Sequence, residues 1–597
     1  MQQYSVPALI QYPQSGSLAS CLVNHAQNQG SKSAIVRRDQ EVWTELTSLE
    51  FLAEVRAVAK GLAASGVGHG DRVAIMSRTR FEWTIADYAI WFIGAVTVPV
   101  YETSSAEQLE WILSDSGAVA VLVETEANLE LLDSVRSNIP SLRHTWIFDR
   151  DALGELKSAG AWISDADVHA RLDAVTPSDV ATIIYTSGTT GRPKGCVVTH
   201  GNFLFLARNV ITAVPEIFAD RSTSTLLFLP LAHVFGRIIE IAMVESGLKV
   251  AFAPDIKNLV SDLAVFKPNF LLAVPRVFEK IFNGSQQKAI TGGKDKIFNA
   301  AAAVSIAYSK GIEAGSIPVG LKVKHALFDA LVYKKIRAAM GGEVVWAVSG
   351  GAALGARLGH FFRGIGLNIL EGYGLTETSS ASTVNLPNAI KIGSVGRPIP
   401  GVTVRIAADG EILVSGAHVF RGYFNNEAAT AEAIDSEGWF HTGDIGHLDE
   451  DGFLFITGRK KELLVTAGGK NVAPAVIEDR LRANWLVGQC LVVGDAKPYI
   501  GCIITLDPES IVQFKSRHGL AESTTFEELS HNEILIAEIQ AAVDHANKAV
   551  SQAESIRRWS LIDADWTIES GHLTPSMKLK RNIVEAQYAA DIEALYS

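Results

Sequence analysis

The chain has 597 residues, 48% of them hydrophobic and 20% charged, which is the composition of a globular enzyme and excludes a disordered or fibrous chain. A chain of this length exceeds what one hydrophobic core can organise, so we expect several core-sized units. The formal net charge of −12 argues against a general nucleic-acid-binding protein, whose surface should be basic. A local pocket can still bind a small anion.

The sequence predicts neither an export signal nor a membrane span. The N-terminal "MQQYSVPALIQYPQSG" lacks a basic region followed by an apolar one, so we expect no signal peptide. The apolar run at 88–101 is interrupted by Gly94 and Pro99 and is well short of the roughly 20 residues that a spanning helix needs. Scattered cysteines without a CxxC pair are typical of a reducing compartment. We expect a cytoplasmic protein and leave peripheral membrane contact open.

Up to about residue 350, short apolar strands alternate with amphipathic helical patterns. The predicted strands cover 72–77, 118–124, 181–188, 225–231 and 343–351. Such alternation is typical of βαβ units and predicts an α/β fold with mostly parallel sheets.

The segment 291–340 and the chain from Gly393 onward differ from this alternation in their hydrophobic pattern. The segment 291–340 is strongly helical without recognisable chemistry, and we interpret it as packing and substrate-tunnel scaffolding. From Gly393 short strands with turn signals predict a small antiparallel sheet or barrel. After Lys461 a separate unit is expected, with a helix at "APAVIEDRLRA", a hairpin at "QCLVVGDAKPYIGCIITLD" and terminal helices.

A loop rich in glycine and hydroxyl groups, "YTSGTTGRPKG" at 185–195, follows one predicted strand and precedes a segment of helical spacing. Glycines let consecutive N–H groups face one anion, and hydroxyls and a lysine add donors and positive charge. The candidate phosphate-binding residues are Thr186, Ser187, Gly188, Thr189, Thr190, Gly191 and Lys194. No Gly-Lys pair of the chain precedes Ser or Thr, which argues against a Walker A motif. Alone, the loop could also be a polar surface turn.

Three later stretches supply the other groups that bind a nucleotide. The stretch "SGGAALGA" at 349–356 is predicted to end a strand in a glycine turn that a flat ring can approach. Tyr373 offers an aromatic face, and Thr376 and Glu377 offer hard oxygens of the kind that bind Mg²⁺. Asp444, in "GWFHTGDIG", can accept hydrogen bonds from ribose hydroxyls. Taken singly, Glu377 and Asp444 are also compatible with solvated turn residues.

Four stretches closely resemble the core motifs of the acyl-adenylate-forming superfamily, which includes acyl-CoA synthetases, firefly luciferases and the adenylation domains of peptide synthetases. They are "YTSGTTGRPKG", "YGLTE", "GWFHTGD" and "GRKKELLVTAGGKNVAP". The run 435–478 and the ending "LTPSMKLKRN" resemble the AMP-forming long-chain fatty acyl-CoA synthetases in particular.

The resemblance implies a large N-terminal domain over 1–459, with stacked βαβ sheets and a small β-barrel-like subdomain, and a smaller, mobile α+β lid over 460–597. It implies a fatty-acid–CoA ligase reaction in two halves. MgATP and a fatty acid first give acyl-AMP and diphosphate, and the CoA thiol then displaces AMP. No covalent enzyme intermediate is required, so the absence of a GxSxG nucleophile motif is expected. Chain-length preference, pathway and oligomeric state stay open.

The resemblance also assigns roles to individual positions. The loop from Thr186 to Lys194 would hold the β- and γ-phosphates, Thr376 would contact the α-phosphate, and Glu377 would bind Mg²⁺. The remaining positions are Gly351, Ala352 and Tyr373 around adenine, Asp444 and Arg459 at the ribose, Lys461 at the hinge, and Gly468 beside the pantetheine arm of CoA.

The adenylation lysine and the acyl pocket are assigned with alternatives. In many relatives that lysine follows a Thr-Gly or Ser-Gly pair, whereas "PSMKLKR" contains no glycine. Lys578 aligns best, and Lys580 is the alternative. His233 and Phe235, in "FLPLAHVFG", are interpreted as a wall or gate of the acyl pocket, and His233 could instead be a packed core histidine.

The acyl substrate is expected to be a fatty acid. Peptide-synthetase relatives place an aspartate near 233–236 to bind an α-amino group, and this stretch holds no acid. Three rivals remain: a fatty acyl-AMP ligase that loads a carrier protein, a luciferase-like oxidoreductase, and a non-catalytic acyl- or nucleotide-binding protein. The last should lack Lys578, Glu377 or Asp444, and all three are present.

Overall fold

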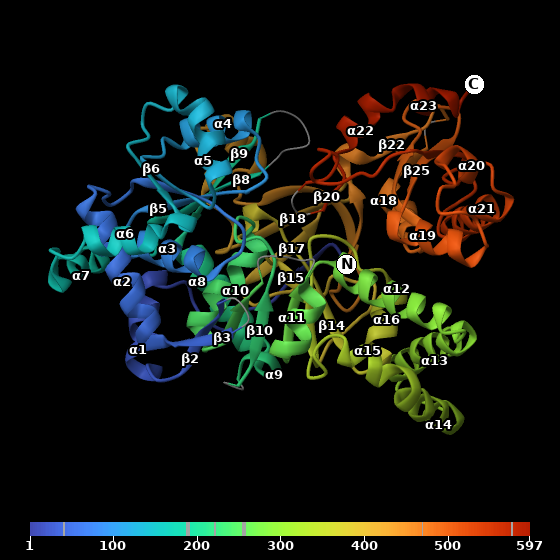
Figure 1. The fold of residues 1–597 in the computed structure, drawn as a ribbon, viewed down its shortest axis with the longest axis horizontal. Helices are drawn as coiled ribbons and strands as arrows, with labels where there is room; N and C mark the ends of the chain where they lie inside the picture. The colour runs from blue at the N-terminus through green and yellow to red at the C-terminus, as the bar shows by residue number, and fades with distance from the viewer. Residues whose placement is uncertain (40–41, 187–191, 220–221, 254–257, 469, 575–576) are drawn as a thin grey trace. The chain divides into compact units, whose positions relative to one another are not determined.

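The computed structural model describes residues 1–597 apart from 40–41, 187–191, 220–221, 254–257, 469 and 575–576. It is a mixed α/β chain, as predicted, and divides into two compact units (Figure 1). Unit 1 comprises Met1–Arg405, Leu413–Thr442 and Leu448–Leu454. Unit 2 comprises Ile406–Ile412, Gly443–His447 and Phe455–Ser597.

A seven-stranded sheet of unit 1 carries the first candidate loop. Its strands, in spatial order, are β19 (Gly422–Tyr423), β9 (Lys194–Thr199), β8 (Val180–Thr186), β5 (Val96–Val100), β4 (Arg72–Met76), β6 (Ala120–Val123) and β7 (His144–Ile147). The strands from β8 to β7 are parallel, whereas β9 is antiparallel to both β8 and β19. Buried aliphatic side chains from the strands and from α4 (Ala106–Ser116) and α5 (Glu126–Val135) form a core against this sheet.

A nine-stranded sheet of unit 1 carries the second candidate region. In spatial order it contains β16 (Arg397–Pro398), β15 (Thr383–Val384), β14 (Asn368–Tyr373), β13 (Trp346–Ser349), β12 (Phe270–Ala273), β10 (Ser224–Leu227), β11 (Lys249–Phe252), β2 (Ser33–Asp39) and β3 (Val42–Thr47). The strands from β14 to β2 are parallel and the outer ones antiparallel. All five strands predicted from apolar runs are present in the two sheets, with ends that differ by a few residues.

Helices that are apolar on most faces fill the core of unit 1, because such a helix is stable only when it is buried all round. The clearest are α3 (Phe81–Phe92), α8 (His200–Ala213) and α10 (Val234–Ser246). The apolar run at 88–101 ends α3 and forms β5, and its apolarity is explained by burial. In the part of the chain that the structure describes, no helix has the length and apolarity to cross a membrane.

The predicted helical segment 291–340 is confirmed. It contains α13 (Asp295–Glu313), α14 (Val319–Phe328), a π-helical turn (Asp329–Tyr333) and α15 (Lys334–Ala338). The other helices of unit 1 are α1 (Leu18–Gln29), α2 (Ser48–Ala64), α6 (Ala152–Ala159), α7 (Asp165–Asp173), α9 (Pro215–Phe218), α11 (Leu259–Phe266), α12 (Pro275–Thr291), α16 (Ala356–Gly364) and α17 (Glu427–Ala433).

The short strands expected after Gly393 form much of a five-stranded sheet. Its order is β1 (Gln3–Ser5), β17 (Val402–Ile406), β18 (Glu411–Gly416), β20 (Phe440–Leu448) and β21 (Leu454–Arg459). The N-terminal strand joins it at one edge, where Gln3 lies opposite Arg405 in an antiparallel pair.

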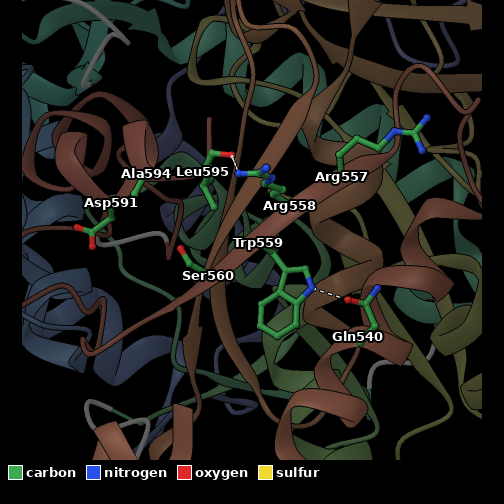
Figure 2. Close-up of a pocket in the computed structure, with 8 residues that line it drawn as sticks. All are labelled: Gln540, Arg557, Arg558, Trp559, Ser560, Asp591, Ala594 and Leu595. Atoms are coloured by element: carbon green, nitrogen blue, oxygen red, sulfur yellow. Dashed lines mark hydrogen bonds between the residues drawn. The ribbon is translucent and has the colours of Figure 1, made fainter. Parts of the chain in front are cut away.

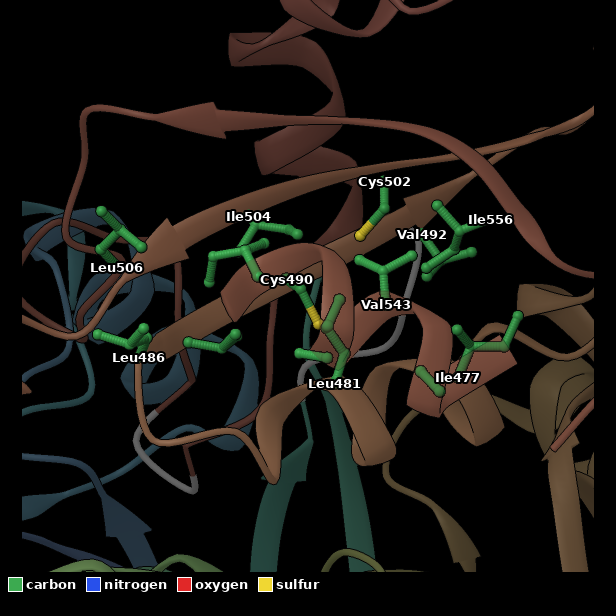
Figure 3. Packing of buried hydrophobic residues seen from close by; sticks show 14 of the residues in the cluster. Ile477, Leu481, Leu486, Cys490, Val492, Cys502, Ile504, Leu506, Val543 and Ile556 are labelled. Atoms are coloured by element: carbon green, nitrogen blue, oxygen red, sulfur yellow. The ribbon is translucent and has the colours of Figure 1, made fainter. Parts of the chain in front are cut away.

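Unit 2 has its own hydrophobic core, shown in Figure 3. Strands β24 (Val487–Val493), β25 (Ile500–Leu506) and β26 (Ile556–Ile562) form a sheet, and α18 (Pro474–Arg482) and α21 (Glu533–Asn547) cover it. The predicted helix and hairpin are therefore confirmed. The unit also contains β22 (Leu464–Val465), β23 (Asn471–Val472), α19 (Pro508–Arg517), α20 (Phe526–Ser530), α22 (Arg581–Gln587) and α23 (Ala589–Ala594).

Candidate active site

The glycine-rich loop joins two antiparallel strands, which differs from the strand-to-helix turn expected from the sequence. Thr186 ends β8 and lies directly opposite Lys194, the first residue of β9, and α8 begins only at His200. The residues after the loop continue the sheet because β-branched Val197 and Val198 can pair with β8. The predicted phosphate-binding residues Ser187, Gly188, Thr189, Thr190 and Gly191 lie outside the described residues.

The end of the loop is attached to α4. The Trp111 indole Nε1–H donates to the carbonyl oxygen of Pro193 at 2.9 Å, and the Arg192 guanidinium lies 4.7 Å from the centre of the Trp111 ring. On the other strand, the Tyr185 hydroxyl donates to Asp115 Oδ2 at 2.5 Å. Both ends of the loop are therefore fixed by contacts with one helix.

Lys194 and Glu377, predicted to serve the phosphates and the metal, are linked by Tyr423, which the sequence analysis missed. The Tyr423 hydroxyl donates to Glu377 Oε1 at 2.8 Å, and the Lys194 Nζ lies 5.1 Å from the centre of the Tyr423 ring. The Phe420 N–H donates to the carbonyl oxygen of Glu377 at 2.7 Å. In the sequence, Tyr423 is marked only by its aromatic type within "RGYF". The pairing of β19 with β9 in the structure is what places it beside Lys194.

Two groups close to the Glu377 carboxylate, the Tyr423 hydroxyl and the Cys196 thiol, have raised pKa values. Burial, followed by the charge of Glu377, raises the pKa of the Tyr423 hydroxyl, which keeps that hydroxyl a hydrogen-bond donor. Burial and then Glu377 also raise the pKa of Cys196, whose thiol therefore stays protonated at neutral pH. Burial disfavours the charged form of both groups, and the nearby carboxylate adds to this effect.

The predicted adenine region lies at the carboxyl ends of two neighbouring parallel strands. Ser349 of β13 pairs with Glu371 of β14, so the turn after β13 lies beside Tyr373, the buried last residue of β14. Gly351 has φ +83°, a conformation that favours glycine, and it is exposed together with Ala352. Ligands of parallel α/β sheets bind at this edge of the sheet.

The turn that carries Thr376 and Glu377 is strained. Thr376 is buried, and the two residues that follow the short helix Thr376–Thr378 have positive φ: Ser379 at +54° and Ser380 at +126°. Non-glycine residues avoid these angles, and such strain gathers at functional sites. Glycine is required at Gly374, because a Cβ there would lie 1.5 Å from the Ser380 carbonyl oxygen.

The acyl-pocket candidates begin α10. His233 is half-buried and is the N-cap, with its Nδ1 accepting from the Phe235 N–H at 3.1 Å, so its imidazole has a capping role besides any role as a wall. The Phe235 ring lies against the turn after β13, with its Cζ 3.1 Å from the position of a Cβ on Gly350. Phe235 is thus next to the predicted adenine turn, and both pocket candidates lie within unit 1.

Asp444 and Arg459 of unit 2 form an ion pair. Arg459 Nε donates to Asp444 Oδ1 at 2.8 Å, and the Asp444 side chain is 6% exposed. Asp444 lies in β20 and Arg459 ends β21, so the two predicted ribose residues come from two strands of the same sheet. Lys461 follows in the short helix Lys460–Glu462 and is exposed.

The remaining predicted residues of unit 2 lie in two exposed loops. Gly468 lies between β22 and β23 and is exposed. Lys578 is exposed. Its backbone N–H donates to the Thr574 hydroxyl at 3.0 Å, and its carbonyl oxygen accepts from the Thr574 N–H at 2.8 Å. Lys580 is half-buried and is the N-cap residue of α22. Arg581 anchors that helix by donating to Glu478 Oε1 at 2.7 Å.

A surface pocket of about 450 Å³ on unit 2 contains none of the predicted residues (Figure 2). It is lined by Gln540, Arg557, Arg558, Trp559, Ser560, Asp591, Ala594 and Leu595. Several of its polar groups have partners within the protein: Trp559 Nε1 donates to Gln540 Oε1 at 2.8 Å, and Arg558 donates to backbone carbonyl oxygens.

Two family models cover most of the chain. The model described as AMP-binding enzyme matches residues 22–424, and the model described as AMP-binding enzyme C-terminal domain matches 461–597. The chain belongs to the AMP-binding enzyme family. The first match includes Lys194, Glu377 and Tyr423, and the second begins at Lys461 and includes Lys578.

This AMP-binding enzyme has full-length relatives. It is 49% identical over 600 residues to "Long-chain-fatty-acid--CoA ligase FadD15" of Mycobacterium bovis, and the same identity is found for FadD15 of Mycobacterium tuberculosis, with 100% of each chain covered. It is 31% identical over 608 residues to "Long-chain-fatty-acid--CoA ligase ACSBG1" of Homo sapiens, covering 95% of this chain and 83% of the relative.

Solved structures of low identity share the fold of this AMP-binding enzyme. The anthranilate CoA ligase AuaEII in complex with anthranoyl-AMP has a TM-score of 0.72 at 20% identity and covers 97% of this chain and 99% of its own. The A-PCP didomain of carboxylic acid reductase from Segniliparus rugosus has a TM-score of 0.74 at 21% identity and covers 98% and 82%.

Proposed function

We propose that this AMP-binding enzyme is a long-chain fatty-acid–CoA ligase that converts ATP, a fatty acid and CoA to acyl-CoA, AMP and diphosphate through an acyl-adenylate. The observation that carries the proposal is the 49% identity over the full length to two proteins named long-chain-fatty-acid–CoA ligases. The linked Lys194, Tyr423 and Glu377 side chains support it, because they combine a cation, a donor and a carboxylate near one loop.

In the first half-reaction a fatty-acid carboxylate oxygen attacks the α-phosphorus of ATP, and diphosphate leaves. Lys194 and the loop that begins at Thr186 would hold the β- and γ-phosphates, and Thr376 would donate to the α-phosphate. Lys578 would bridge the acyl carboxylate and the α-phosphate. Charge on phosphorus is stabilised by such positioned donors and not by covalent chemistry.

Glu377 suits a magnesium ion that is shared with the nucleotide. Mg²⁺ is commonly held by one or two carboxylates together with substrate phosphates, and not by a cage of protein ligands. Among the described residues no group of three or more His, Cys, Asp or Glu side chains gathers as a metal site. The Glu377 carboxylate accepts from the Tyr423 hydroxyl at Oε1. The ion would neutralise phosphate charge, and Tyr423 would orient the carboxylate.

In the second half-reaction the CoA thiol attacks the acyl carbon of the adenylate, and AMP leaves. Tyr373 and the turn at Gly351 and Ala352 would frame adenine throughout, while Asp444, oriented by Arg459, would accept hydrogen bonds from the ribose hydroxyls. The exposed hairpin at Gly468 would admit the pantetheine arm.

The backbone before Lys578 supports its choice over Lys580. In many relatives the adenylation lysine follows a glycine, and here Met577 precedes Lys578 with φ +64°. A left-handed conformation at this position is what glycine adopts without strain. Met577 thus has a conformation that favours glycine one residue before Lys578, whereas Lys580 is the N-cap residue of α22.

Fatty-acid-dependent release of diphosphate, measured with and without CoA, tests the proposed function. We expect AMP and acyl-CoA in equal amounts when CoA is present. Adenylate formation that never yields the thioester would favour a fatty acyl-AMP ligase, and no diphosphate release with any fatty acid would favour a binding protein. Light emission with oxygen would favour the luciferase-like branch.

The catalytic efficiency is expected to rise with acyl chain length and to be greatest for fatty acids of about twelve carbons or more. Each methylene taken out of water contributes about 0.8 kcal/mol, which is about a fourfold change. The measurement is kcat/KM for a series of even-numbered acids from acetate to palmitate. Equal efficiencies for acetate and palmitate would contradict an apolar acyl site beside Phe235.

Lys461→Pro is expected to separate the two half-reactions. We propose Lys461 as the hinge, and its position as first residue of the matched C-terminal domain supports this. Proline fixes φ near −65° and removes the N–H, so a hinge that must change φ and ψ would be trapped. We expect near-normal acyl-AMP formation and much slower transfer to CoA, measured as separate half-reactions. Lys461→Ala is the control and should be mild in both; equal slowing of both by proline would contradict the hinge.

A further inference from the structure

The helix α14 presents an apolar stripe to solvent. Val319, Val323 and Leu327 are four residues apart, which places them on one face of the helix, and their exposed fractions are 77%, 65% and 57%. None of the ten residues of α14 is fully buried. Leu331, in the π-helical turn that follows, is 49% exposed and continues the apolar surface.

The opposite face of α14 is fixed to the rest of unit 1. The His325 ring stacks on Tyr308 of α13 with centroids 3.9 Å apart, and its Nε2 lies 2.6 Å from the carbonyl oxygen of Gly364 in α16. Leu321 and Phe328 are half-buried on the same side. Because the inner face of α14 already has these contacts, a rotation of the helix that buried the apolar stripe would break them. The interpretation of 291–340 as packing holds for α13 and not for the outer face of α14.

Lysines border the stripe on both sides. Lys322 and Lys324 are exposed, and the helical repeat of 3.6 residues puts them on opposite flanks of the line through Val319, Val323 and Leu327. Lys334 and Lys335 are also exposed, one turn beyond. The sequence from 319 to 337 has a single acidic residue, Asp329, and it pairs with Arg337 at 2.8 Å. The four lysines thus give a local positive charge to a chain whose net charge is −12.

We propose that α14 and the turn after it, residues 319–335, bind the surface of an anionic phospholipid bilayer. An amphipathic helix with lysines beside large aliphatic side chains lies in the lipid interface, with its apolar face among the acyl chains and its cations at the headgroups. A protein partner would need acidic and apolar groups in one fixed, complementary arrangement. A bilayer instead offers repeated anionic headgroups above acyl chains, and this matches an aliphatic stripe with lysines along both sides. This binding does not rest on the proposed function, although it would bring a ligase to bilayer-dissolved fatty acid.

The test is sedimentation of the full-length protein with vesicles of phosphatidylcholine containing phosphatidylglycerol, compared with phosphatidylcholine alone. We expect binding to the anionic vesicles that weakens with added salt. Val323→Ser with Leu327→Ser should lower the partition coefficient about tenfold or more, because two aliphatic side chains leave the lipid. Lys322→Gln with Lys324→Gln should lower binding and its salt dependence together.

The matched control is Val512→Ser with Ile534→Ser, which removes two aliphatic side chains of 64% and 47% exposure from unit 2 and should leave binding unchanged. Thermal unfolding of every variant should match that of the unchanged chain, because all these positions are exposed. Absence of binding to anionic vesicles, or equal binding by the Val323/Leu327 variant, would overturn the proposal. Vesicle-independent dimerisation lost in that variant would also overturn it, in favour of a contact between copies of the chain.

Discussion

Lys578→Ala is expected to slow acyl-adenylate formation by about 10²-fold or more and to leave thioester formation from supplied acyl-AMP largely intact. The reason is that the proposed ammonium group bridges two negative groups, the acyl carboxylate and the α-phosphate, which otherwise repel each other as the new bond forms. In the second half-reaction, where AMP is the leaving group, the Lys578 ammonium group is not needed to bring these two negative groups together. The measurement is fatty-acid-dependent diphosphate release for the first half and acyl-CoA formation from synthetic acyl-AMP for the second.

Lys580→Ala is the matched control for this prediction. It changes a neighbouring lysine at the N-cap position of α22, whose side chain makes no capping hydrogen bond, and we expect both half-reactions to stay within a few-fold of the unchanged enzyme. If Lys580→Ala instead shows the split and Lys578→Ala does not, the assignment is displaced by two residues. If both variants adenylate at the normal rate, neither lysine performs the step.

Arg237→Ala is expected to destabilise unit 1 by about 3–5 kcal/mol, since it leaves the buried Asp87 carboxyl group without its cation. The Arg237 side chain has no exposed area and donates to Asp87 of α3 and, at 2.6 Å, to the Thr182 hydroxyl of β8. Thr97 of β5 also donates to Asp87, and the Thr182 hydroxyl donates to the Thr97 carbonyl oxygen at 2.7 Å. The network thus connects α10, which begins with the acyl-pocket candidates, to the strand that leads into the phosphate loop.

Other contacts of Arg237 add to the expected loss of stability in Arg237→Ala. The guanidinium lies 5.2 Å and 5.1 Å from the ring centres of Trp83 and Trp91, so its loss also leaves a cavity between two large rings. Glu240 is buried beside the pair, and burial followed by the charge of Asp87 raises the pKa of its carboxyl well above the usual range. Burial also raises the pKa of Asp87, and the charge of Arg237 acts against that rise, so Arg237 is the group that favours the ionised form of Asp87.

Urea unfolding followed by tryptophan fluorescence measures this prediction, and Trp83 and Trp91 beside Arg237 are two of the 11 tryptophans that contribute to the signal. The control is the double variant Arg237→Met with Asp87→Leu, which removes both charges and should recover most of the lost free energy of unfolding. A loss below about 1 kcal/mol for Arg237→Ala would show that the network does not stabilise unit 1.

The family and the fold class were predictable because each depends on local sequence. The five predicted strands are runs of β-branched and apolar residues, which favour extended structure wherever they are buried, and all five are confirmed. The motifs around 185, 373 and 444 predicted the adenylate-forming family, and the matches over 22–424 and 461–597 confirm it. The roles of individual site residues, the domain boundary at 459 and 460, and the compartment stay predictions.

The apolar run at 88–101 shows where local sequence is ambiguous. Its hydrophobicity is compatible with a membrane, a buried helix or a buried strand, since all three remove apolar surface from water. Gly94 and Pro99 argued against a span, and the structure shows the end of α3 followed by β5. The glycine-rich loop was wrongly expected to lead into a helix, because the short strand β9 between the loop and α8 has no pattern of its own apart from Val197 and Val198.

What the sequence determined by itself is the set of chemical groups: a glycine- and hydroxyl-rich loop with Lys194, an aromatic residue at 373, carboxylates at 377 and 444, and lysines near the C-terminus. These follow from residue type and spacing along the chain. What only the tertiary structure decided is which groups meet. Tyr423 reaches Glu377 across 46 residues because β19 pairs with β9, and this pairing depends on hydrogen bonds between segments that no local pattern encodes. The structure was also needed to show that the aliphatic stripe of α14 is exposed, because the same spacing is typical of a buried helix face. The stacking of His325 on Tyr308 identifies the opposite face as the buried one.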